Sequence, residues 1–229
     1  MTTHQLPWQS SGHTNRQRVF TQSTKLQDVL YEIRGPVHAH AARLEAEGHR
    51  ILKLNIGNPA PFGFEAPDVI MRDMIQALPY AQGYSDSQGI ASARRAVFTR
   101  YELVDGFPRF DIDDVYLGNG VSELITMTLQ ALLDNGDQVL IPAPDYPLWT
   151  ASTSLAGGTP VHYLCDETQG WQPDLADMES KITERTKALV VINPNNPTGA
   201  VYGREVLTQM ADLARKHQLL LLADEIYDK

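Results

Sequence analysis

The stretch Ala188-Leu-Val-Val-Ile-Asn-Pro-Asn-Asn-Pro-Thr-Gly199 joins a run of apolar residues to a turn that is rich in asparagine and proline. A second stretch of the same kind, Leu219-Leu-Leu-Leu-Ala-Asp-Glu-Ile-Tyr227, follows after one helical pattern. Both apolar runs have the composition of parallel strands that are buried on both faces. Ligands of open α/β folds bind at the carboxyl edge of such strands. The polar ends of the two stretches are therefore expected to form half of a binding site.

The same alternation of short apolar runs and helical patterns extends over the whole region from Val115 onward. It predicts strands at 115–117, 138–141, 160–165, 188–192 and 219–222, and helices at 121–133, 147–155, 174–182 and 204–217. Before this region, the sequence predicts helices at 36–48, 67–78 and 88–102, a strand at 51–54 and an irregular loop at 57–63. This order is typical of an α/β fold in which a mostly parallel sheet has flanking helices.

Composition and charge argue against several classes of partner. The chain has 229 residues, of which 42% are hydrophobic and 21% are charged, as is ordinary for a globular protein. Its net charge of −9 comes with no cluster of Lys and Arg, so neither nucleic acid nor a membrane is expected as a partner. The single Cys165 permits no internal disulfide, and a cytoplasmic location is expected.

The polar ends of the two opening stretches suit the cofactor pyridoxal phosphate. This cofactor needs a carboxylate beside its pyridine nitrogen, which keeps the ring protonated and able to accept electrons. Asp224 can supply that carboxylate, and Asn196 and Tyr227 can donate hydrogen bonds to the phenolic oxygen of the ring. An aspartate after a strand is also a common turn residue. The hypothesis therefore depends on the joint pattern and not on Asp224 alone.

A phosphate cradle is predicted at Gly118-Asn-Gly-Val-Ser122, between a predicted strand and a predicted helix. Backbone N–H groups at the start of a helix bind anions, helped by the helix dipole. Gly120, Val121 and Ser122 are the predicted donors. The alternative is a dinucleotide-binding turn, but Glu123 stands where that fingerprint requires a third glycine. The pattern therefore disfavours an enzyme that transfers hydride.

An aromatic face for the cofactor ring is expected from the segment Pro144-Asp-Tyr-Pro-Leu-Trp149. Tyr146 is the predicted stacking residue, and Trp149 is the alternative. Either residue could instead be an ordinary core aromatic that follows a strand. The sequence leaves this choice open.

The lysines and histidines show no catalytic pattern. A pyridoxal phosphate enzyme needs a lysine for its Schiff base. No lysine of the chain stands in a suitable motif: Lys25, Lys53, Lys181, Lys187, Lys216 and Lys229. The seven histidines show no metal-ligand spacing, because His38 and His40 point to different faces of a helix. No catalytic residue and no metal site is therefore predicted.

From about Leu26 to Lys229 the chain resembles the class I/II aminotransferases of fold type I, which depend on pyridoxal 5'-phosphate. The resemblance rests on the two opening stretches and on the segments 31–36, 54–63 and 143–149, which are similar to bacterial glutamate-pyruvate (alanine) aminotransferases. It implies the large domain of a fold type I transferase and a homodimer. It also implies transfer of an amino group between L-alanine, or a related amino acid, and the 2-oxo acid 2-oxoglutarate.

The resemblance implies roles for individual residues. The cofactor positions are occupied here by Asp224 at the pyridine nitrogen, Asn196 and Tyr227 at the phenolic oxygen, Gly120, Val121 and Ser122 at the phosphate, and Tyr146 on the ring. Tyr84 takes the place of a tyrosine that reaches the phosphate of the neighbouring subunit. Gly57 and Asn196 would bind the substrate carboxylate. Tyr31 and Arg34 belong to an arm that resembles one covering the family's pocket.

The resemblance also divides the chain. It implies a flexible extension at 1–25, an arm with part of the small domain at 26–62, and the cofactor-binding large domain at 63–229. Family members carry a Ser-x-x-Lys segment and two further arginines beyond the matching region. These groups have no counterpart here. We therefore expect an amino-terminal part of an aminotransferase, truncated before the Schiff-base lysine and inactive alone.

Two alternative functions fit the same residues. Carbon-sulfur lyases of this fold share much of the pocket, and a non-catalytic truncated remnant could bind the cofactor without turnover. A transcription regulator that bears an aminotransferase-like domain is disfavoured. Too few residues precede the matching region to form the DNA-binding domain that such a regulator needs.

Overall fold

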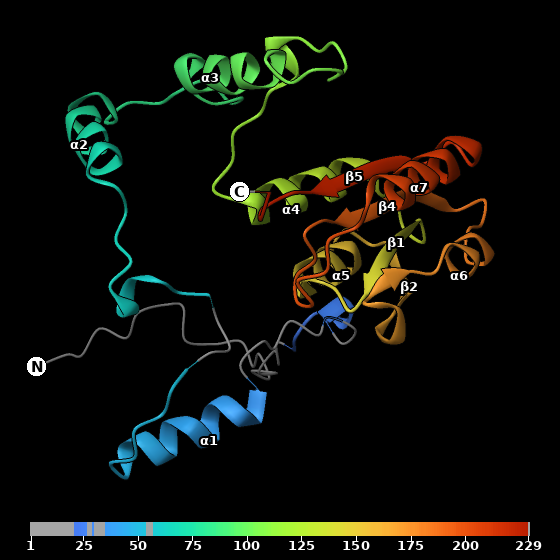
Figure 1. The fold of residues 1–229 in the computed structure, drawn as a ribbon, viewed down its shortest axis with the longest axis horizontal. Coiled ribbons are helices and arrows are strands. Elements are labelled where there is room, and N and C mark those ends of the chain that lie inside the picture. Colours follow the sequence, from blue (N-terminus) through green and yellow to red (C-terminus); the bar gives the residue numbers. More distant parts are fainter. Residues whose placement is uncertain (1–20, 27–28, 30–34, 54–56, 229) are drawn as a thin grey trace, which may run out of the picture.

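The computed structural model describes residues 21–26, 29, 35–53 and 57–228, and its buried core is built on a mostly parallel β-sheet (Figure 1). The strands are β1 (Gln138–Ala143), β2 (Thr159–Asp166), β3 (Gln172–Pro173), β4 (Thr186–Ile192) and β5 (Leu220–Asp224). Within the described residues they form one sheet in the order β3-β2-β1-β4-β5. β3 pairs antiparallel with β2, and every other pairing is parallel. The predicted α/β class is confirmed.

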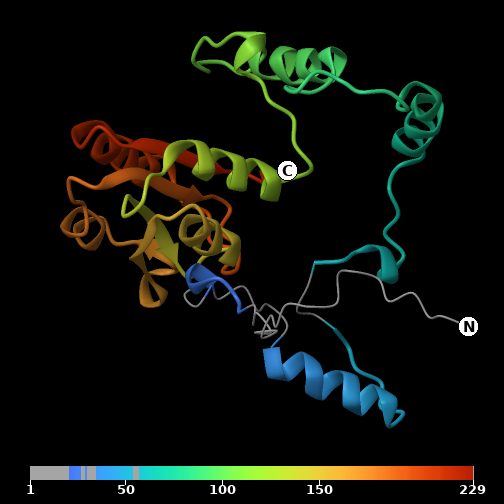
Figure 2. The ribbon, with the colours of Figure 1, turned by 180° about the vertical axis from the view of Figure 1, so that it is seen from behind.

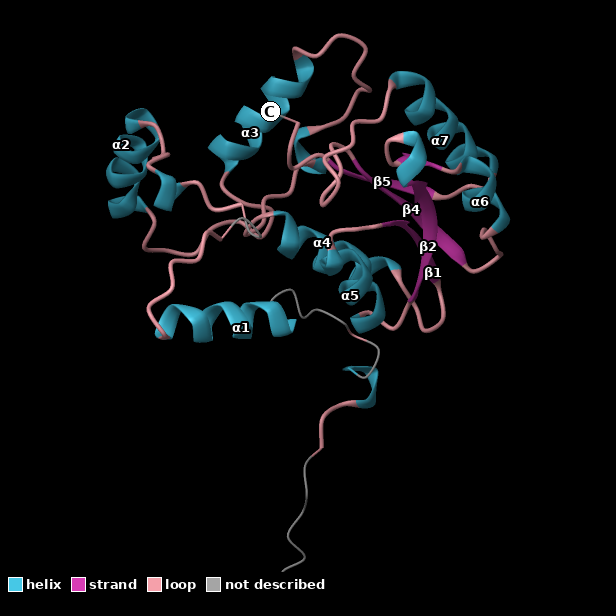
Figure 3. Ribbon diagram, turned by 60° about the horizontal axis from the view of Figure 1, so that its bottom comes forward, coloured by secondary structure: helices cyan, strands magenta, loops and turns pink. Residues whose placement is uncertain are grey.

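Helices cover both faces of this sheet (Figure 3). They are α4 (Val121–Leu132) and α5 (Pro147–Leu155) on one face, and α6 (Leu175–Ser180) and α7 (Arg204–Lys216) on the other. Neighbouring residues of β4 serve the two faces in turn, because Val190 packs with residues of α4 and α5 while Leu189 packs with residues of α6 and α7. Each such side chain stabilises the fold by roughly 1.5–3 kcal/mol when it is fully buried.

The strand β5 is exposed over part of its length. Its apolar run is typical of a strand buried on both faces, but Leu220 and Leu221 are exposed. The reason is its place at the edge of the described sheet, where β4 is its partner on one side. Asp224 at its end is nevertheless buried.

The helices that precede α4 lie apart from the sheet (Figures 1 and 2). They are α1 (Gly35–Ala46), α2 (Asp68–Ala77) and α3 (Ala91–Glu102). Single-turn 3-10 helices lie along the chain at η1 (Thr24–Leu26), η2 (Ala60–Phe62), η3 (Leu78–Tyr80), η4 (Ile112–Asp114) and η5 (Glu167–Gln169). Neither α1 nor α2 has a buried residue in the described part of the chain. Exposed apolar side chains of α2 include Val69, Ile70, Met74 and Ile75.

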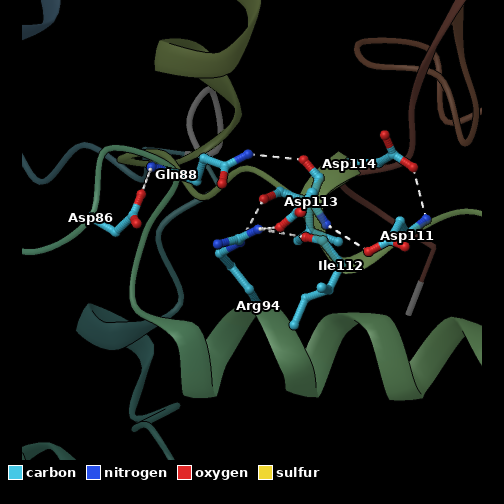
Figure 4. A network of polar contacts seen from close by, with 8 residues as sticks. Asp86, Gln88, Arg94, Asp111, Ile112, Asp113 and Asp114 are labelled. Atoms are coloured by element: carbon cyan, nitrogen blue, oxygen red, sulfur yellow. Dashed lines mark hydrogen bonds and ion pairs between the residues drawn. The ribbon is translucent and has the colours of Figure 1, made fainter.

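The segment between α3 and α4 is held by the buried side chain of Arg94 (Figure 4). Its Nε donates to the carbonyl oxygen of Val115 at 3.0 Å. Its Nη2 donates to the carbonyl oxygen of Ile112 at 2.7 Å and to Asp113 Oδ1 at 3.0 Å. The carbonyl group of Val115 is therefore paired with a side chain instead of a neighbouring strand. The predicted strand at 115–117 is wrong for this reason.

The other predicted elements show where the sequence pattern was sufficient. From residue 121 onward, every predicted helix and strand is found, with ends that differ by at most two residues. The described part of the strand predicted at 51–54, residues 51–53, has no regular structure, and the loop at 57–63 contains η2. β3 was not predicted, since two residues are too short to show a pattern.

Candidate cofactor site

The asparagine-rich turn at 193–199 follows β4, and the segment 224–227 begins at the end of β5. The carboxyl ends of these two strands bring the two segments together. Ile192 and Asp224 are partners in the sheet register. The backbone N–H of Asn193 donates to the carbonyl oxygen of Asp224 at 3.0 Å. The turn at 193–199 therefore begins directly beside Asp224, at one edge of the sheet, as the sequence predicts.

The three asparagines of this turn have different tasks. Asn193 Oδ1 accepts a hydrogen bond from the backbone N–H of Tyr202 at 2.8 Å. Asn195 Oδ1 accepts from the backbone N–H of Thr198 at 3.2 Å and from its hydroxyl at 2.8 Å. These two side chains hold the turn in shape. The side chain of Asn196 makes no hydrogen bond with any other described residue, so its amide is available to a ligand.

Asn196 and Tyr227 line the same open pocket, although they come from different motifs. The pocket has a volume of about 330 Å³ and is lined by Pro194, Asn195, Asn196, Pro197, Gly199 and Tyr227. Tyr227 is 55% exposed, and within the described chain its hydroxyl has no hydrogen-bond partner. The structure thus places the two predicted donors to the phenolic oxygen together. Asp224 is buried behind them and is not among the lining residues.

The carboxylate of Asp224 is 3% exposed and accepts two hydrogen bonds. Its Oδ2 accepts from the indole Nε1 of Trp149 at 3.0 Å, and its Oδ1 accepts from the backbone N–H of Ile226 at 3.3 Å. An ionised carboxylate can accept about four hydrogen bonds. Acceptor capacity therefore remains at Asp224, which has no ion pair with another described residue.

The two aromatic candidates for the ring face occupy different environments. Trp149 on α5 is 4% exposed and packs within the core cluster beneath α4 and α5. Tyr146 immediately precedes α5, is half-buried, and packs against the edge of the same cluster. A ring enclosed in the core offers no free face, so this placement favours Tyr146. No local sequence pattern predicts the hydrogen bond from Trp149 to Asp224, because 75 residues separate the two positions.

The predicted phosphate cradle lies at the start of α4. Gly120 has a positive φ of 77° and directly precedes the helix. The backbone N–H of Asn119 donates to the carboxylate of Glu123, so an anion bound here would share the helix start with a negative side chain. Gly120 and Ser122 are exposed and Val121 is half-buried. The backbone N–H of Gly120 donates to the carbonyl oxygen of Gly118 at 2.9 Å, so this one of the three predicted donors is already paired.

The cradle and the ring face lie on neighbouring helices. Residues of α4 and α5 contact one another, and the hydroxyls of Thr126 and Ser152 are 3.4 Å apart across this contact. Thr126 also donates to the carbonyl oxygen of Ser122 at 3.0 Å. The phosphate-binding turn is thereby linked to the helix that carries the ring face.

Four lysines form ion pairs away from the candidate site. Lys181 and Lys216 belong to the surface of α6 and α7, where they pair with Asp177 and Glu179. Lys187 pairs with Asp137 at 3.2 Å, at the opposite end of the sheet from the site. Lys53 pairs with Glu45 at 2.8 Å beside α1. These four side chains are committed to carboxylates outside the candidate site.

Several predicted site residues are not brought to this edge of the sheet. Tyr84 is fully exposed in the segment between η3 and α3, and Gly57 is exposed before η2. Tyr31 and Arg34 lie outside the described residues. The roles implied for these four positions stay predictions.

The described residues were also compared with the requirements of a metal site, a membrane-spanning helix and a reactive cysteine. They contain no group of three His, Cys, Asp or Glu side chains that could hold a metal ion. No helix among them combines the length and apolar character needed to cross a membrane. Cys165 is buried, and burial raises the pKa of its thiol. A protonated thiol is a poor nucleophile, so Cys165 is a core residue.

Comparison with known proteins gives a consistent result. A family model described as "Aminotransferase class I and II" matches residues 49–229. An alanine aminotransferase of Mycobacterium tuberculosis (strain ATCC 25618 / H37Rv) is 90% identical over 229 residues, which are 100% of this chain and 53% of that protein. The glutamate-pyruvate aminotransferase AlaA of Escherichia coli (strain K12) is 59% identical over 207 residues, which are 90% of this chain and 51% of that protein.

A solved structure shows the same architecture. The crystal structure of an aminotransferase from Escherichia coli matches with a TM-score of 0.88 and 57% sequence identity. The match covers 93% of this chain and 52% of that chain. The chain thus spans about half the length of the curated relatives and of the solved structure that it matches.

Proposed function

The chain belongs to the class I and II aminotransferases, and from this premise we propose that it forms part of the pyridoxal phosphate site of an alanine transaminase. The reaction would transfer an amino group between L-alanine and 2-oxoglutarate. Aminotransferases of this class use pyridoxal phosphate with amino acid and 2-oxo acid substrates. Support for alanine comes from relatives that are named alanine aminotransferase and glutamate-pyruvate aminotransferase.

The observation that carries the proposal is the buried carboxylate of Asp224. It accepts hydrogen bonds from Trp149 and Ile226 and has no cationic partner among the described residues. A buried charge without such a partner is destabilising. A protonated pyridine nitrogen offers both a hydrogen-bond donor and a positive charge to a carboxylate of this kind.

When it is bound, pyridoxal phosphate supplies an electron-accepting ring for the chemistry of the amino group. In our proposal Asp224 holds the ring nitrogen in its protonated form. Asn196 and Tyr227 donate hydrogen bonds to the phenolic oxygen, and Tyr146 covers one face of the ring. These residues thereby bind and orient the cofactor and exclude water from one side of it.

The phosphate would be bound by the backbone N–H groups of Val121 and Ser122, and by that of Gly120 in exchange for its hydrogen bond to the carbonyl oxygen of Gly118. A helix start favours an anion because its first N–H groups lack partners within the helix. Support comes from the accessible position of this turn and from its link to α5. The negative charge of Glu123 beside the turn would weaken the interaction with the phosphate.

Substrate and partner contacts complete the proposal. The backbone N–H of Gly57, together with Asn196, would bind the substrate carboxylate, and Tyr31 and Arg34 would cover the pocket.

The protein would be a homodimer in which Tyr84 reaches the phosphate of the neighbouring subunit. The full exposure of Tyr84 supports this arrangement, as do the exposed apolar side chains of α2, since contiguous apolar surface often marks an interface. Sedimentation equilibrium tests the dimer, and a monomer at every concentration would contradict it.

Cofactor binding can be tested with pyridoxamine 5'-phosphate, which binds without forming a bond to lysine. We expect the chain to bind this ligand, as followed by ligand fluorescence. The substitution Asp224→Asn should weaken binding by about 10-fold to 100-fold, the range for a charge-assisted hydrogen bond. Asp212→Asn is the matched control, because Asp212 is exposed on α7 and pairs with Arg215. Equal affinity of the two variants would contradict the role of Asp224.

The reaction itself can be tested with the protein isolated from its native source. We expect pyruvate to form from L-alanine in the presence of 2-oxoglutarate where the isolated protein also carries the Schiff-base lysine, and no turnover by the 229-residue chain alone. Cystathionine serves as the second substrate, because carbon-sulfur lyases of this fold cleave it without an oxo acid. Turnover of cystathionine alone would replace the transaminase proposal with a lyase. Cofactor binding without turnover of either substrate would identify a non-catalytic protein.

A further inference from the structure

We propose that Thr150 is a positioning residue that holds Tyr146 in place as the face of the cofactor ring, an inference that rests on the function proposed above. Thr150 belongs to the first turn of α5, four residues after Tyr146. It does not line the pocket that contains Asn196 and Tyr227. Its hydroxyl instead joins two other polar side chains.

The hydroxyl of Thr150 lies between a carboxylate and an imidazole. Thr150 Oγ1 donates to Asp145 Oδ2 at 2.7 Å. The distance from Thr150 Oγ1 to His162 Nε2 is 2.9 Å. A hydroxyl has one proton to donate, and here that proton is directed to Asp145. His162 Nε2 is therefore the donor to Thr150, which gives a chain of hydrogen bonds from the imidazole to the carboxylate.

Both ends of this chain are attached to the fold. His162 lies on β2, opposite Ile141 of β1, and its carbonyl oxygen accepts a hydrogen bond from Lys181 Nζ at 2.8 Å. Asp145 lies in the turn between β1 and α5. The chain of hydrogen bonds therefore connects this turn to the second strand of the sheet.

The turn fixed in this way is the one that presents Tyr146. Asp145 directly precedes Tyr146, so a restrained Asp145 side chain limits the backbone freedom of the next residue. The carbonyl oxygen of Tyr146 accepts from the backbone N–H of Trp149 at 3.1 Å. The indole of Trp149 in turn reaches Asp224. The first turn of α5 thus joins the hydrogen bonds of Thr150 to Tyr146, the predicted ring face. Through Trp149 it also joins them to Asp224, the predicted partner of the ring nitrogen.

Removal of the hydroxyl should loosen this turn without disturbing the rest of the sheet. Thr150→Val keeps the shape of the side chain and removes both hydrogen bonds. We expect hydrogen exchange at the backbone N–H of Trp149, measured by NMR, to become roughly tenfold faster because the first turn opens more often. Exchange at Leu140 and Leu189, in the buried strands, should stay as in the wild type. Binding of pyridoxamine 5'-phosphate should weaken by about fivefold to tenfold, the loss of one or two ordinary hydrogen bonds.

Two controls separate positioning from a general loss of stability. Thr150→Ser retains the hydroxyl and should restore both exchange and binding to nearly wild-type values. Thr208→Val removes a hydroxyl from the exposed helix α7, where Thr208 donates to the carbonyl oxygen of Arg204 at 2.8 Å. This second control should change neither measurement. His162→Ala removes the donor at an exposed position and serves as an independent variant if Thr150→Val does not fold.

The outcomes are distinct. The inference would be overturned if the backbone N–H of Trp149 exchanged at the wild-type rate in Thr150→Val. If Thr150→Val does not fold, the same result in His162→Ala would overturn it. Faster exchange with unchanged ligand affinity would also overturn it, since Thr150 would then only stabilise the helix. Failure of the wild-type chain to bind pyridoxamine 5'-phosphate would contradict the proposed function instead. The exchange measurement would in that case still decide whether Thr150 holds the turn.

Discussion

Trp149 Nε1 donates a hydrogen bond to Asp224 Oδ2 at 3.0 Å, and both residues are almost completely buried. This contact joins the first turns of α5 to the end of β5. An N–H donor is the appropriate neighbour for an ionised carboxylate in an apolar setting, because it offsets part of the desolvation of the charge. Trp149 is therefore assigned to the support of Asp224.

We predict that Trp149→Phe destabilises the chain by about 1–3 kcal/mol, because the substitution keeps an aromatic ring but removes the donor to a buried carboxylate. Urea unfolding measures the change. Trp171→Phe is the matched control, since the indole of Trp171 makes no hydrogen bond with any other described residue. The two variants should differ clearly in unfolding midpoint, and coincident midpoints would show that the bond to Asp224 contributes nothing.

The neighbouring residues Asn195 and Asn196 should respond differently to the same substitution. Asn195→Ala removes the acceptor for both hydrogen bonds from Thr198, and we expect a loss of stability of about 1–2 kcal/mol. Asn196→Ala removes no hydrogen bond to a described residue, so its stability should stay within about 0.5 kcal/mol of the wild type. Its affinity for pyridoxamine 5'-phosphate should nevertheless fall. Urea unfolding and ligand titration of both variants test these different effects on stability and on affinity. If the two asparagines had the same role, both variants would show the same effects.

Glu179 should make stability depend on pH in the acid range. Hydrogen bonds from Lys216 and then from His217 lower the pKa of Glu179 below its ordinary value of 4.5. A carboxyl with a lowered pKa stabilises the folded chain above the unfolded pKa, and this contribution is lost as the pH falls through the lowered value. Glu179→Gln should therefore be less stable than the wild type at pH 7, and the difference should shrink below pH 4.5.

Urea midpoints at a series of pH values test this expectation. Glu184→Gln is the control, because Glu184 is exposed and has no ion pair with another described residue. Its midpoint should follow that of the wild type at every pH. A constant gap between Glu179→Gln and the wild type from pH 7 into the acid range would contradict the predicted linkage.

The sequence was sufficient for the part of the site that depends on strand ends. Parallel strands place their carboxyl ends at one edge of a sheet, and the apolar runs before Asn193 and Asp224 locate those ends. The proximity of the asparagine-rich turn to Asp224 follows from this geometry. Tyr227, three residues further on, then faces the same pocket as Asn196.

The sequence was insufficient where a distant side chain decides the outcome. Val115 to Leu117 has the composition of a strand, but Arg94 satisfies the carbonyl group of Val115. The backbone N–H of Leu117 donates to the carbonyl oxygen of Gln88. Asn195 accepts hydrogen bonds within the turn and Asn196 does not, and this difference also depends on contacts that a residue pattern does not encode. In both cases the competing hydrogen bonds become visible only in three dimensions.

Gly120 tests whether the start of α4 needs a special backbone conformation. Its φ of 77° and ψ of 172° lie in a region that is essentially restricted to glycine. A Cβ atom at this position would meet no other heavy atom within 4 Å, so any penalty must come from the backbone itself. We predict that Gly120→Ala costs about 1–3 kcal/mol of stability, or that the turn rearranges and loses affinity for the phosphate group of pyridoxamine 5'-phosphate.

Gly203 provides the control, because it precedes α7 in the same way with an ordinary φ of −72° and also has open space around it. Gly203→Ala should change stability by no more than about 0.5 kcal/mol. Equal effects of the two substitutions on urea unfolding and on ligand affinity would show that the cradle does not depend on the conformation of Gly120.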